Sequence, residues 1–528
     1  MTGETPVLQN SKKRHRRRKV AGRGGDNFPW EQTLFPLPKN TVSDILNLCY
    51  LYNENDNCMN RRSLLLILLL LTLCIPALAH KKAEYNLIVD TDCGIDDFRM
   101  LQFILASKDF NVNAIVTNDG VLSPQEGAKR IKGMLAYFGH EGIPVAAGKS
   151  LNKKFMHRDF ASSLVWPGYP GFDYQKDAVT LIHERLNAHR SKDIYLVSGT
   201  LTNLAALLKT YPEDSVQISR VVWYHNPDDP GMNYTRDSLA AIYVLEHIST
   251  VEFVCNPNAY RLSDDYFLAL KSMDNKYATS VTNFHSQQVQ EGNSSQIPVY
   301  IWDECLPVYV LFPPYFVKNG NANVPRSPEE LEMLMMGILD VNKPTEGVIY
   351  KNMPVDKPWL QDDVANLADS IIRAHGYDAF NVIAMTNEFH GHLGIYSIIG
   401  AKMGIRATEY FHVGLNELEI WSYAGKTPPL SCMHDGLQFS TGASLGYGTI
   451  HVVEADKYRP VAEFEYNGIR ITMALKDKYI RQFEKDIALS IEKYGNLTKA
   501  YWDDVRRNGL RYWLELDRNE IFDVIHQK

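Results

Sequence analysis

From residue 83 onward, short apolar runs alternate with segments whose apolar residues recur at helical spacing. Strands and helices are predicted in turn at residues 85–90, 96–107, 112–118, 123–139, 193–199 and 202–211. Ser123 and Pro124 stand where a helix prefers its N-cap and its first residue. This alternation predicts an α/β fold with an open, mostly parallel sheet that is covered by helices.

A second pattern begins near residue 379, after a predicted helix at 363–376. It contains the Gly-rich stretch 435–448 and ends in a charged, aromatic tail, 476–525, that is predicted to be helical. No internal repeat relates the two parts. We therefore expect a smaller α+β domain after the α/β domain.

Residues 59–79 (MNRRSLLLILLLLTLCIPALA) have the three parts of a secretory signal: two arginines, an apolar core and a small-x-small cleavage site. This predicts export, with a periplasmic or extracellular protein. The uncharged run of 17 residues also reaches the lower limit for a membrane span, so a signal anchor is the alternative. The expected division of the chain is an upstream extension of disordered composition (1–58), the signal (59–79), the α/β domain (83–378) and the α+β domain (379–528).

Charge is distributed unevenly along the 528 residues. Residues 1–79 hold 11 Lys/Arg and 6 Asp/Glu, a charge of +5, so the remainder must carry −12 to give the total of −7. An acidic body argues against a nucleic-acid partner and suits metal cations or neutral ligands. None of the seven cysteines forms a CxxC pair, which argues against a zinc ribbon. Membrane contact is expected only through the signal or anchor segment, and the sequence leaves a homo-oligomer open.

The stretch DTDCGIDD follows the first predicted strand and places Asp90, Asp92, Asp96 and Asp97 around Gly94. Ligands of such folds bind at the carboxyl ends of the strands. Four carboxylates in one turn repel each other, and a hard cation such as Ca²⁺ removes that conflict by taking several oxygen ligands. A glycine lets the loop turn tightly. Capping of the next helix is the alternative, but it explains only one or two of the acids.

DTDCGIDD resembles the signature of the inosine–uridine-type nucleoside hydrolases, calcium enzymes that cleave the N-glycosidic bond of nucleosides. Three further segments resemble family motifs in the same order: SGTLTNLAALL (198–208), MNYTRDSLAA (232–241) and WDECLPVYVLFPPYF (302–316). The resemblance spans residues 83–378. It implies a hydrolase that releases base and ribose from a small nucleoside substrate.

The resemblance also implies roles for individual residues. Ca²⁺ would be held by Asp92, Asp97, Asp303 and the backbone carbonyl of Ser198. Asp92 would in addition accept a proton from the metal-bound water, whose pKa the cation lowers.

Other residues of the same motifs would hold the sugar. Asp96 would bind the ribose 2′- and 3′-hydroxyls, and Asn233 would hold the sugar from the other side. Asp90 would fix the loop from behind the ligands.

Several positions depart from the family pattern. Gly231 stands where the family often has a glutamate, so a sugar contact is missing or supplied elsewhere. Gly120 aligns with another polar contact, and Asn118 or Asp119 is expected to substitute for it.

The aromatic residues bear on the choice of base. Trp302 replaces a histidine that protonates the leaving base in one branch of the family. An indole cannot be a general acid, but it can stack on a purine, which resembles the purine-preferring branch. Trp166 is either a second stacking face or an ordinary loop aromatic. His157 and His225 are candidate acids, although a lone histidine is more often structural.

The second part, over roughly residues 385–475, resembles the FmdE family of formylmethanofuran dehydrogenase proteins. His390, His392 and Cys432 are candidate ligands of a second metal, because imidazole and thiolate suit Zn²⁺. Ala443 stands where a second cysteine is common, so the alternative is that these side chains only pack and hydrogen-bond.

Two other functions compete with hydrolysis by the first domain. One is a non-catalytic protein that captures a nucleoside-like ligand, which Gly231 and Trp302 keep open. The other is a bifunctional protein whose C-terminal domain acts on another small molecule. Intact metal carboxylates argue against a pure binding protein, because binding alone does not need a site that activates water.

Overall fold

The computed structural model describes residues 83–153, 158–291, 299–342 and 355–526. The predicted signal and its upstream extension lie outside the described residues, as does His157. None of the helices in the described part of the chain combines the length and the apolar character that crossing a bilayer requires.

The first region is built on an eight-stranded sheet with the order β3-β2-β1-β4-β5-β6-β8-β7. Its strands are β1 (Tyr85–Thr91), β2 (Phe110–Thr117), β3 (Val145–Ala147), β4 (Asp193–Val197), β5 (Ile218–Tyr224), β6 (Val251–Val254), β7 (Phe316–Asn319) and β8 (Ala322–Pro325). Neighbouring strands are parallel except β7 and β8. The predicted open, mostly parallel sheet is confirmed.

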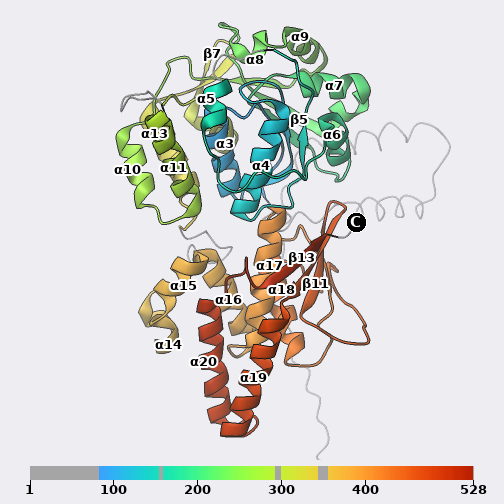
Figure 1. Ribbon diagram of the computed structural model, residues 1–528, viewed down its shortest axis with the longest axis vertical. Helices are drawn as coiled ribbons and strands as arrows, with labels where there is room; N and C mark the ends of the chain where they lie inside the picture. The colour runs from blue at the N-terminus through green and yellow to red at the C-terminus, as the bar shows by residue number, and fades with distance from the viewer. Residues whose placement is uncertain (1–82, 154–157, 292–298, 343–354, 527–528) are drawn as a thin grey trace, which may run out of the picture. The chain divides into compact units, whose positions relative to one another are not determined.

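Helices cover both faces of this sheet, because successive side chains of a strand point to opposite faces. Leu87 and Val89 of β1 pack in one core, and Ile88 packs in the other. Figure 1 shows the helices of this region around the sheet. They are α3 (Ile95–Ala106), α4 (Pro124–Phe138), α5 (Arg158–Ser163), α6 (Ala178–Leu186), α7 (Thr202–Thr210), η1 (Pro212–Gln217), α8 (Met232–Thr235), α9 (Ser238–His247), α10 (Asp264–Ser272), α11 (Lys276–Glu291), α12 (Cys305–Leu311), η2 (Pro313–Tyr315) and α13 (Pro328–Leu339).

Helix α4 illustrates why the sequence pattern located these elements. Ser123 caps it and accepts a hydrogen bond from the backbone N–H of Glu126 at 3.3 Å. Pro124 is its first residue, and Gly139 ends it with a left-handed φ of 86°. Start and stop signals of this kind place α4 within a residue or two of its predicted range.

The second region contains a five-stranded sheet with the order β10-β9-β11-β12-β13, in which only β9 and β10 are paired in parallel. Its strands are β9 (Glu419–Ser422), β10 (Ile450–Val452), β11 (Val461–Tyr466), β12 (Ile469–Leu475) and β13 (Phe522–His526). Its helices are η3 (Lys357–Trp359), α14 (Asp362–Ala365), α15 (Ala368–His375), α16 (Tyr377–His390), α17 (Ile395–Phe411), η4 (Leu430–Cys432), α18 (Met433–Thr441), α19 (Asp477–Tyr494) and α20 (Lys499–Glu515). The predicted smaller domain of mixed structure is confirmed.

Two details of this region differ from the prediction. The tail is helical in α19 and α20, but the prediction of helix to residue 525 is wrong, because β13 pairs with β12. The predicted boundary at residue 379 lies inside α16, and Ile371 of α15 packs in one core with Phe380 of α16 and Trp513 of α20.

Candidate active site

The loop after β1 carries the first part of the site. Gly94 is needed there for space rather than for a tight turn, because its φ is −70° and the left-handed residue is Cys93, with φ of 60°. A Cβ added at Gly94 would lie 2.8 Å from carboxylate oxygens of both Asp96 and Asp97. The backbone N–H of Gly94 donates to Asp97 at 2.8 Å, which turns this carboxylate back over the start of α3.

Three carboxylates from distant parts of the chain meet beside this loop. Asp96, Asp97 and Asp303 each place an oxygen within 4.8 Å of the others, and no other such group of three metal-ligating side chains occurs among the described residues. Asp303 is 3% exposed. Its Oδ1 finds no hydrogen-bond donor in the described part of the chain. We call Asp92, Asp96, Asp97 and Asp303 the carboxylate cluster.

Burial and mutual repulsion act together on this carboxylate cluster. Burial raises the pKa of Asp92, and the neighbouring charge of Asp97 raises it further. Burial also raises the pKa of Asp303 well above its usual range, with added contributions from the charges of Asp96, Asp97 and Asp92. Without a cation, carboxylates this close must share protons or repel. An all-oxygen, buried set with an unsatisfied acceptor fits a calcium ion.

Ser198 lies directly next to the cluster. Its hydroxyl donates to Asp97 Oδ1 at 2.5 Å. Its backbone carbonyl, the predicted metal ligand, accepts a hydrogen bond from Asn233 Nδ2 at 2.9 Å. The structure therefore brings Asp97, Ser198 and Asn233 into one chain of contacts.

Asp90 lies behind the cluster, fully buried, and joins three elements. It accepts hydrogen bonds from Asn118 and Tyr195 at 2.8 Å each and from Asn203 at 3.0 Å. Burial raises its pKa to about 7 although these three bonds oppose the shift. Sequence reasoning missed Tyr195 and Asn203, and only the position of Asn203 within the motif that follows β4 could have indicated it.

The two residues predicted to replace a sugar contact are engaged with the chain itself. Asn118 donates to Asp90, and its carbonyl oxygen accepts from the backbone and hydroxyl of Thr200 at 3.1 and 3.3 Å. Asp119 accepts hydrogen bonds from Arg158 and Arg236. Their role in substrate binding stays a prediction.

The segment of Asn233 leaves room for a substrate. Asn233 is part of α8, and its amide nitrogen donates to the carbonyls of Ser198 and Tyr224 at 2.9 and 3.0 Å. A Cβ added at Gly231 would meet no atom within 4 Å. Within the described ranges, no other side chain therefore fills the place of the glutamate that is missing at Gly231.

Trp302 lies on the exposed side of the site, with 42% of its surface exposed. Its indole stacks on Tyr300 with ring centroids 5.4 Å apart and planes 10° apart. The guanidinium of Arg261 lies over Tyr300 at 4.9 Å from the ring centroid. One face of the indole is thus supported from below, and the exposed remainder can meet a ligand.

A buried ion pair, which sequence reasoning missed, fixes the backbone at Trp302. Glu304 accepts a hydrogen bond from the Trp302 backbone N–H at 2.8 Å and pairs with Arg99 of α3. Glu304 is fully buried and Arg99 is 3% exposed. No local pattern indicates this pair, since its members lie 205 residues apart.

The other candidates around the base are structural. Trp166 is 6% exposed and packs edge-on against Phe98, so it belongs to the core. His225 is buried against Trp223, with ring centroids 4.3 Å apart, and burial lowers its pKa to about 4. These positions favour the structural interpretation of both residues over a stacking face or a general acid.

In the second region, His390 and His392 lie side by side, with ring centroids 4.3 Å apart. His390 Nδ1 bonds Asp435 at 2.7 Å, while the Nε2 atoms of His390 and His434 are buried with no partner in the described ranges. Cys432 is half-buried and reduced, and burial raises the pKa of its thiol. His390, His392 and Cys432 do not form a compact three-ligand group among the described residues.

Comparison with known proteins agrees with the motifs. Residues 87–337 match the family model of the inosine-uridine preferring nucleoside hydrolases. Residues 389–523 match the model of FmdE, from the molybdenum formylmethanofuran dehydrogenase operon. The predicted resemblance of these two regions to the two families is confirmed.

Curated relatives align with part of the first region. The chain is 32% identical over 144 residues to the pyrimidine-specific ribonucleoside hydrolase RihA of Shewanella sp. (strain MR-7), covering 26% of this chain and 45% of the relative. It is 32% identical over 145 residues to the non-specific ribonucleoside hydrolase RihC of Klebsiella pneumoniae, covering 26% of this chain and 47% of the relative. The chain thus spans about half the length of the curated relatives it matches.

Solved structures resemble the first region at low identity. A plant nucleoside hydrolase has a TM-score of 0.42 at 18% identity, covering 49% of this chain and 99% of its own. A purine-preferring ribonucleoside hydrolase from Gardnerella vaginalis has a TM-score of 0.40 at 16% identity, covering 48% of this chain and 99% of its own.

Proposed function

We propose that the first region hydrolyses the N-glycosidic bond of ribonucleosides in a calcium-dependent reaction that releases base and ribose. The observation that supports this most is the buried meeting of Asp96, Asp97 and Asp303 within 4.8 Å of one another. Such a cluster is costly to bury without a cation, and it lies in a region that matches a nucleoside hydrolase model.

The calcium ligands would be Asp92, Asp97, Asp303 and the carbonyl of Ser198, all of them oxygen donors. Bound Ca²⁺ would supply the acidification of a water molecule for attack on the anomeric carbon. The unsatisfied Oδ1 of Asp303 supports this ligand set, because a cation would be its missing partner.

The chain's own residues would do the rest. Asp92 would accept the proton of the attacking water, and the N–H of Val121 holds its Oδ2 at 3.3 Å. Asp96 would bind the 2′- and 3′-hydroxyls. Asn233 uses its nitrogen for backbone carbonyls, which leaves its oxygen to accept from a sugar hydroxyl. Such hydroxyl contacts strengthen as the ring flattens toward an oxocarbenium ion.

The test is release of ribose from inosine, adenosine and uridine by the full chain, with Ca²⁺ and with excess chelator. Hydrolysis predicts release that requires Ca²⁺. Saturable nucleoside binding without ribose release would instead favour a non-catalytic binding protein, which the open space at Gly231 keeps as the alternative. Neither binding nor release would leave the C-terminal region as the carrier of the main activity.

We further propose a preference for purine nucleosides. Trp302 precedes Asp303, and its supported indole can stack on the departing base. Stacking on an aromatic side chain is worth about 1–3 kcal/mol per base, and the purine offers the larger face. The names of the curated relatives describe pyrimidine-specific and non-specific enzymes, so the choice of base is a sharp test of this proposal.

Trp302→Ala is expected to lower kcat/KM for inosine about tenfold, the equivalent of about 1.4 kcal/mol of lost stacking. Its effect on nitrophenyl riboside should be smaller, because that leaving group departs readily without help. Trp359→Ala removes an exposed tryptophan outside the first region and should change neither substrate's kinetics. Equal losses on both substrates would show that Trp302 shapes the pocket rather than binding the base.

For the second region we propose a Zn²⁺ site at His390, His392 and Cys432. Its support is the pair of adjacent imidazoles and the unpartnered Nε2 of His390 among the described residues. Elemental analysis of the purified full chain should find about one zinc per chain, and His390→Ala should lose it. Equal zinc content in the two proteins would contradict the site.

A further inference from the structure

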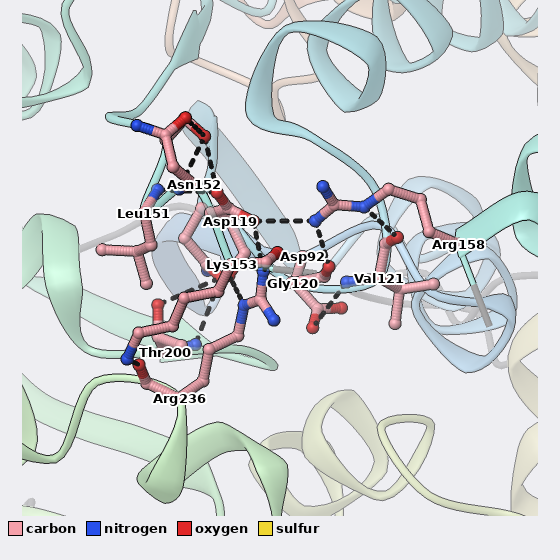
Figure 2. Close-up of polar contacts among 12 residues, drawn as sticks. Asp92, Asp119, Gly120, Val121, Leu151, Asn152, Lys153, Arg158, Thr200 and Arg236 are labelled. Atoms are coloured by element: carbon pink, nitrogen blue, oxygen red, sulfur yellow. Dashed lines mark hydrogen bonds and ion pairs between the residues drawn. The ribbon is translucent and has the colours of Figure 1, made fainter. Parts of the chain in front are cut away.

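Asp119 is a buried carboxylate whose oxygens are fully used by the protein. Its Oδ2 accepts from the Ser150 hydroxyl at 2.7 Å and the Leu151 N–H at 2.6 Å. Its Oδ1 accepts from Arg158 at 2.8 Å and Arg236 at 2.7 Å, as Figure 2 shows. Burial opposes the charge of Asp119, but the hydrogen bonds from Ser150, Arg236 and Arg158 outweigh it and lower the pKa.

The two arginines also bind the backbone of the same turn. Arg158 donates to the carbonyls of Gly120 at 2.7 Å and Val121 at 3.2 Å. Arg236 donates through Nε to the carbonyl of Asp119 itself at 2.7 Å. Three successive carbonyls therefore point at guanidinium groups, and the turn has one orientation. We call Asp119, Arg158 and Arg236 the Asp119 cluster.

This turn lies directly against Asp92. The N–H of Val121 donates to Asp92 Oδ2 at 3.3 Å, and the N–H of Leu122 donates to the Asp92 carbonyl at 3.0 Å. A Cβ added at Gly120 would lie only 2.0 Å from Asp92 Oδ2, so the bare backbone of Gly120 packs on the carboxylate. Any shift of the turn must move the Asp92 carboxylate or leave it loose.

The same cluster reaches the segment of Asn233. Arg236 follows α8, and its backbone N–H donates to the carbonyl of Met232 at 3.0 Å. Its side chain, 5% exposed, is held by Asp119. One buried carboxylate thus ties the turn that supports Asp92 to the segment that carries Asn233.

We propose that Asp119, Arg158 and Arg236 are positioning residues, which fix the Asp92 carboxylate through the turn 119–122 and fix Asn233 relative to it. This inference rests on the proposed function for its kinetic consequences. Its geometric part stands alone, because Asp92 is also a proposed calcium ligand. Asp119 then acts on the substrate only through the groups that it positions.

Arg158→Ala is the most direct test, because it releases the carbonyls of the turn without touching the carboxylate cluster. We expect kcat to fall about ten- to hundredfold, the scale of a misplaced catalytic group, while KM changes less than about threefold. Millimolar guanidinium should restore part of the lost kcat, since it can occupy the vacated place. Calcium affinity, measured by calorimetry, should weaken with kcat.

Arg220→Ala is the matched control. It removes a guanidinium that pairs with Glu252 at 2.8 Å from the opposite end of the sheet, where β5 begins. It should leave kcat, calcium affinity and the response to guanidinium unchanged. Should Arg158→Ala fail to fold, Asp119→Asn keeps the size and removes only the charge, with the same expected loss of kcat and of calcium affinity.

The outcomes separate this inference from the proposed function. Wild-type protein that binds Ca²⁺ but releases no ribose, with weaker binding in Arg158→Ala, supports positioning and contradicts hydrolysis. Active wild type with unchanged kcat and calcium affinity in Arg158→Ala overturns positioning and leaves hydrolysis intact. A kcat loss that guanidinium does not restore, with unchanged calcium affinity, also overturns it.

Discussion

Asp92→Asn is expected to lower the turnover of ribonucleosides by at least about a hundredfold, the scale usual for a lost general base. An amide cannot take up the proton of the attacking water. Its size matches that of the carboxylate, which matters because Gly120 packs directly on Asp92. The Val121 N–H can still donate to the amide oxygen, so the loop should keep its conformation.

The comparison should be made on kcat with saturating nucleoside and Ca²⁺. Asp214→Asn is a suitable control, because Asp214 is 1% exposed and accepts hydrogen bonds from His183 and Asn187 far along the chain from the cluster. It should cost stability and spare kcat. Turnover near the wild-type value in Asp92→Asn would remove Asp92 as the base, and the proton acceptor would have to be sought elsewhere.

Local sequence signals predicted the framework because each acts within one element. The alternation of Leu87, Ile88 and Val89 between two cores, and the Ser123 cap of α4, follow from strand and helix geometry alone. The carboxylate cluster was accessible for a related reason: parallel strands bring their carboxyl ends to one edge, so acids that follow strands tend to meet.

What the sequence did not predict depends on pairing between distant residues. Helix signals continue to the end of α20, yet the last residues complete a sheet as β13 because β12 offers an unpaired edge. Glu304 and Arg99 pair across the fold, and Arg158 and Arg236 converge on Asp119 from separate parts of the chain. Asp119 therefore looks like a substrate ligand in the motif and like a structural anchor in the fold.

Removing calcium is expected to abolish ribose release and to lower the melting temperature of the first region. A ligand present at about a hundred times its Kd stabilises the native state by about 2.7 kcal/mol. For a domain of this size, that corresponds to a loss of about 5–10 °C with chelator. Calorimetry with Ca²⁺, with EGTA and with Mg²⁺ measures it, and Mg²⁺ should restore little because it demands a smaller octahedral site.

Asp303→Asn makes the same prediction specific to the carboxylate cluster. With Ca²⁺ present, the variant should melt below the wild type, since it lacks a charged ligand. With EGTA present, the order should reverse, because the amide removes one negative charge from a buried group that includes Asp96 and Asp97. A chelator effect of equal size in the two proteins would place the stabilising ion elsewhere in the molecule. Reversal of the order would tie calcium, stability and the buried carboxylates to one site.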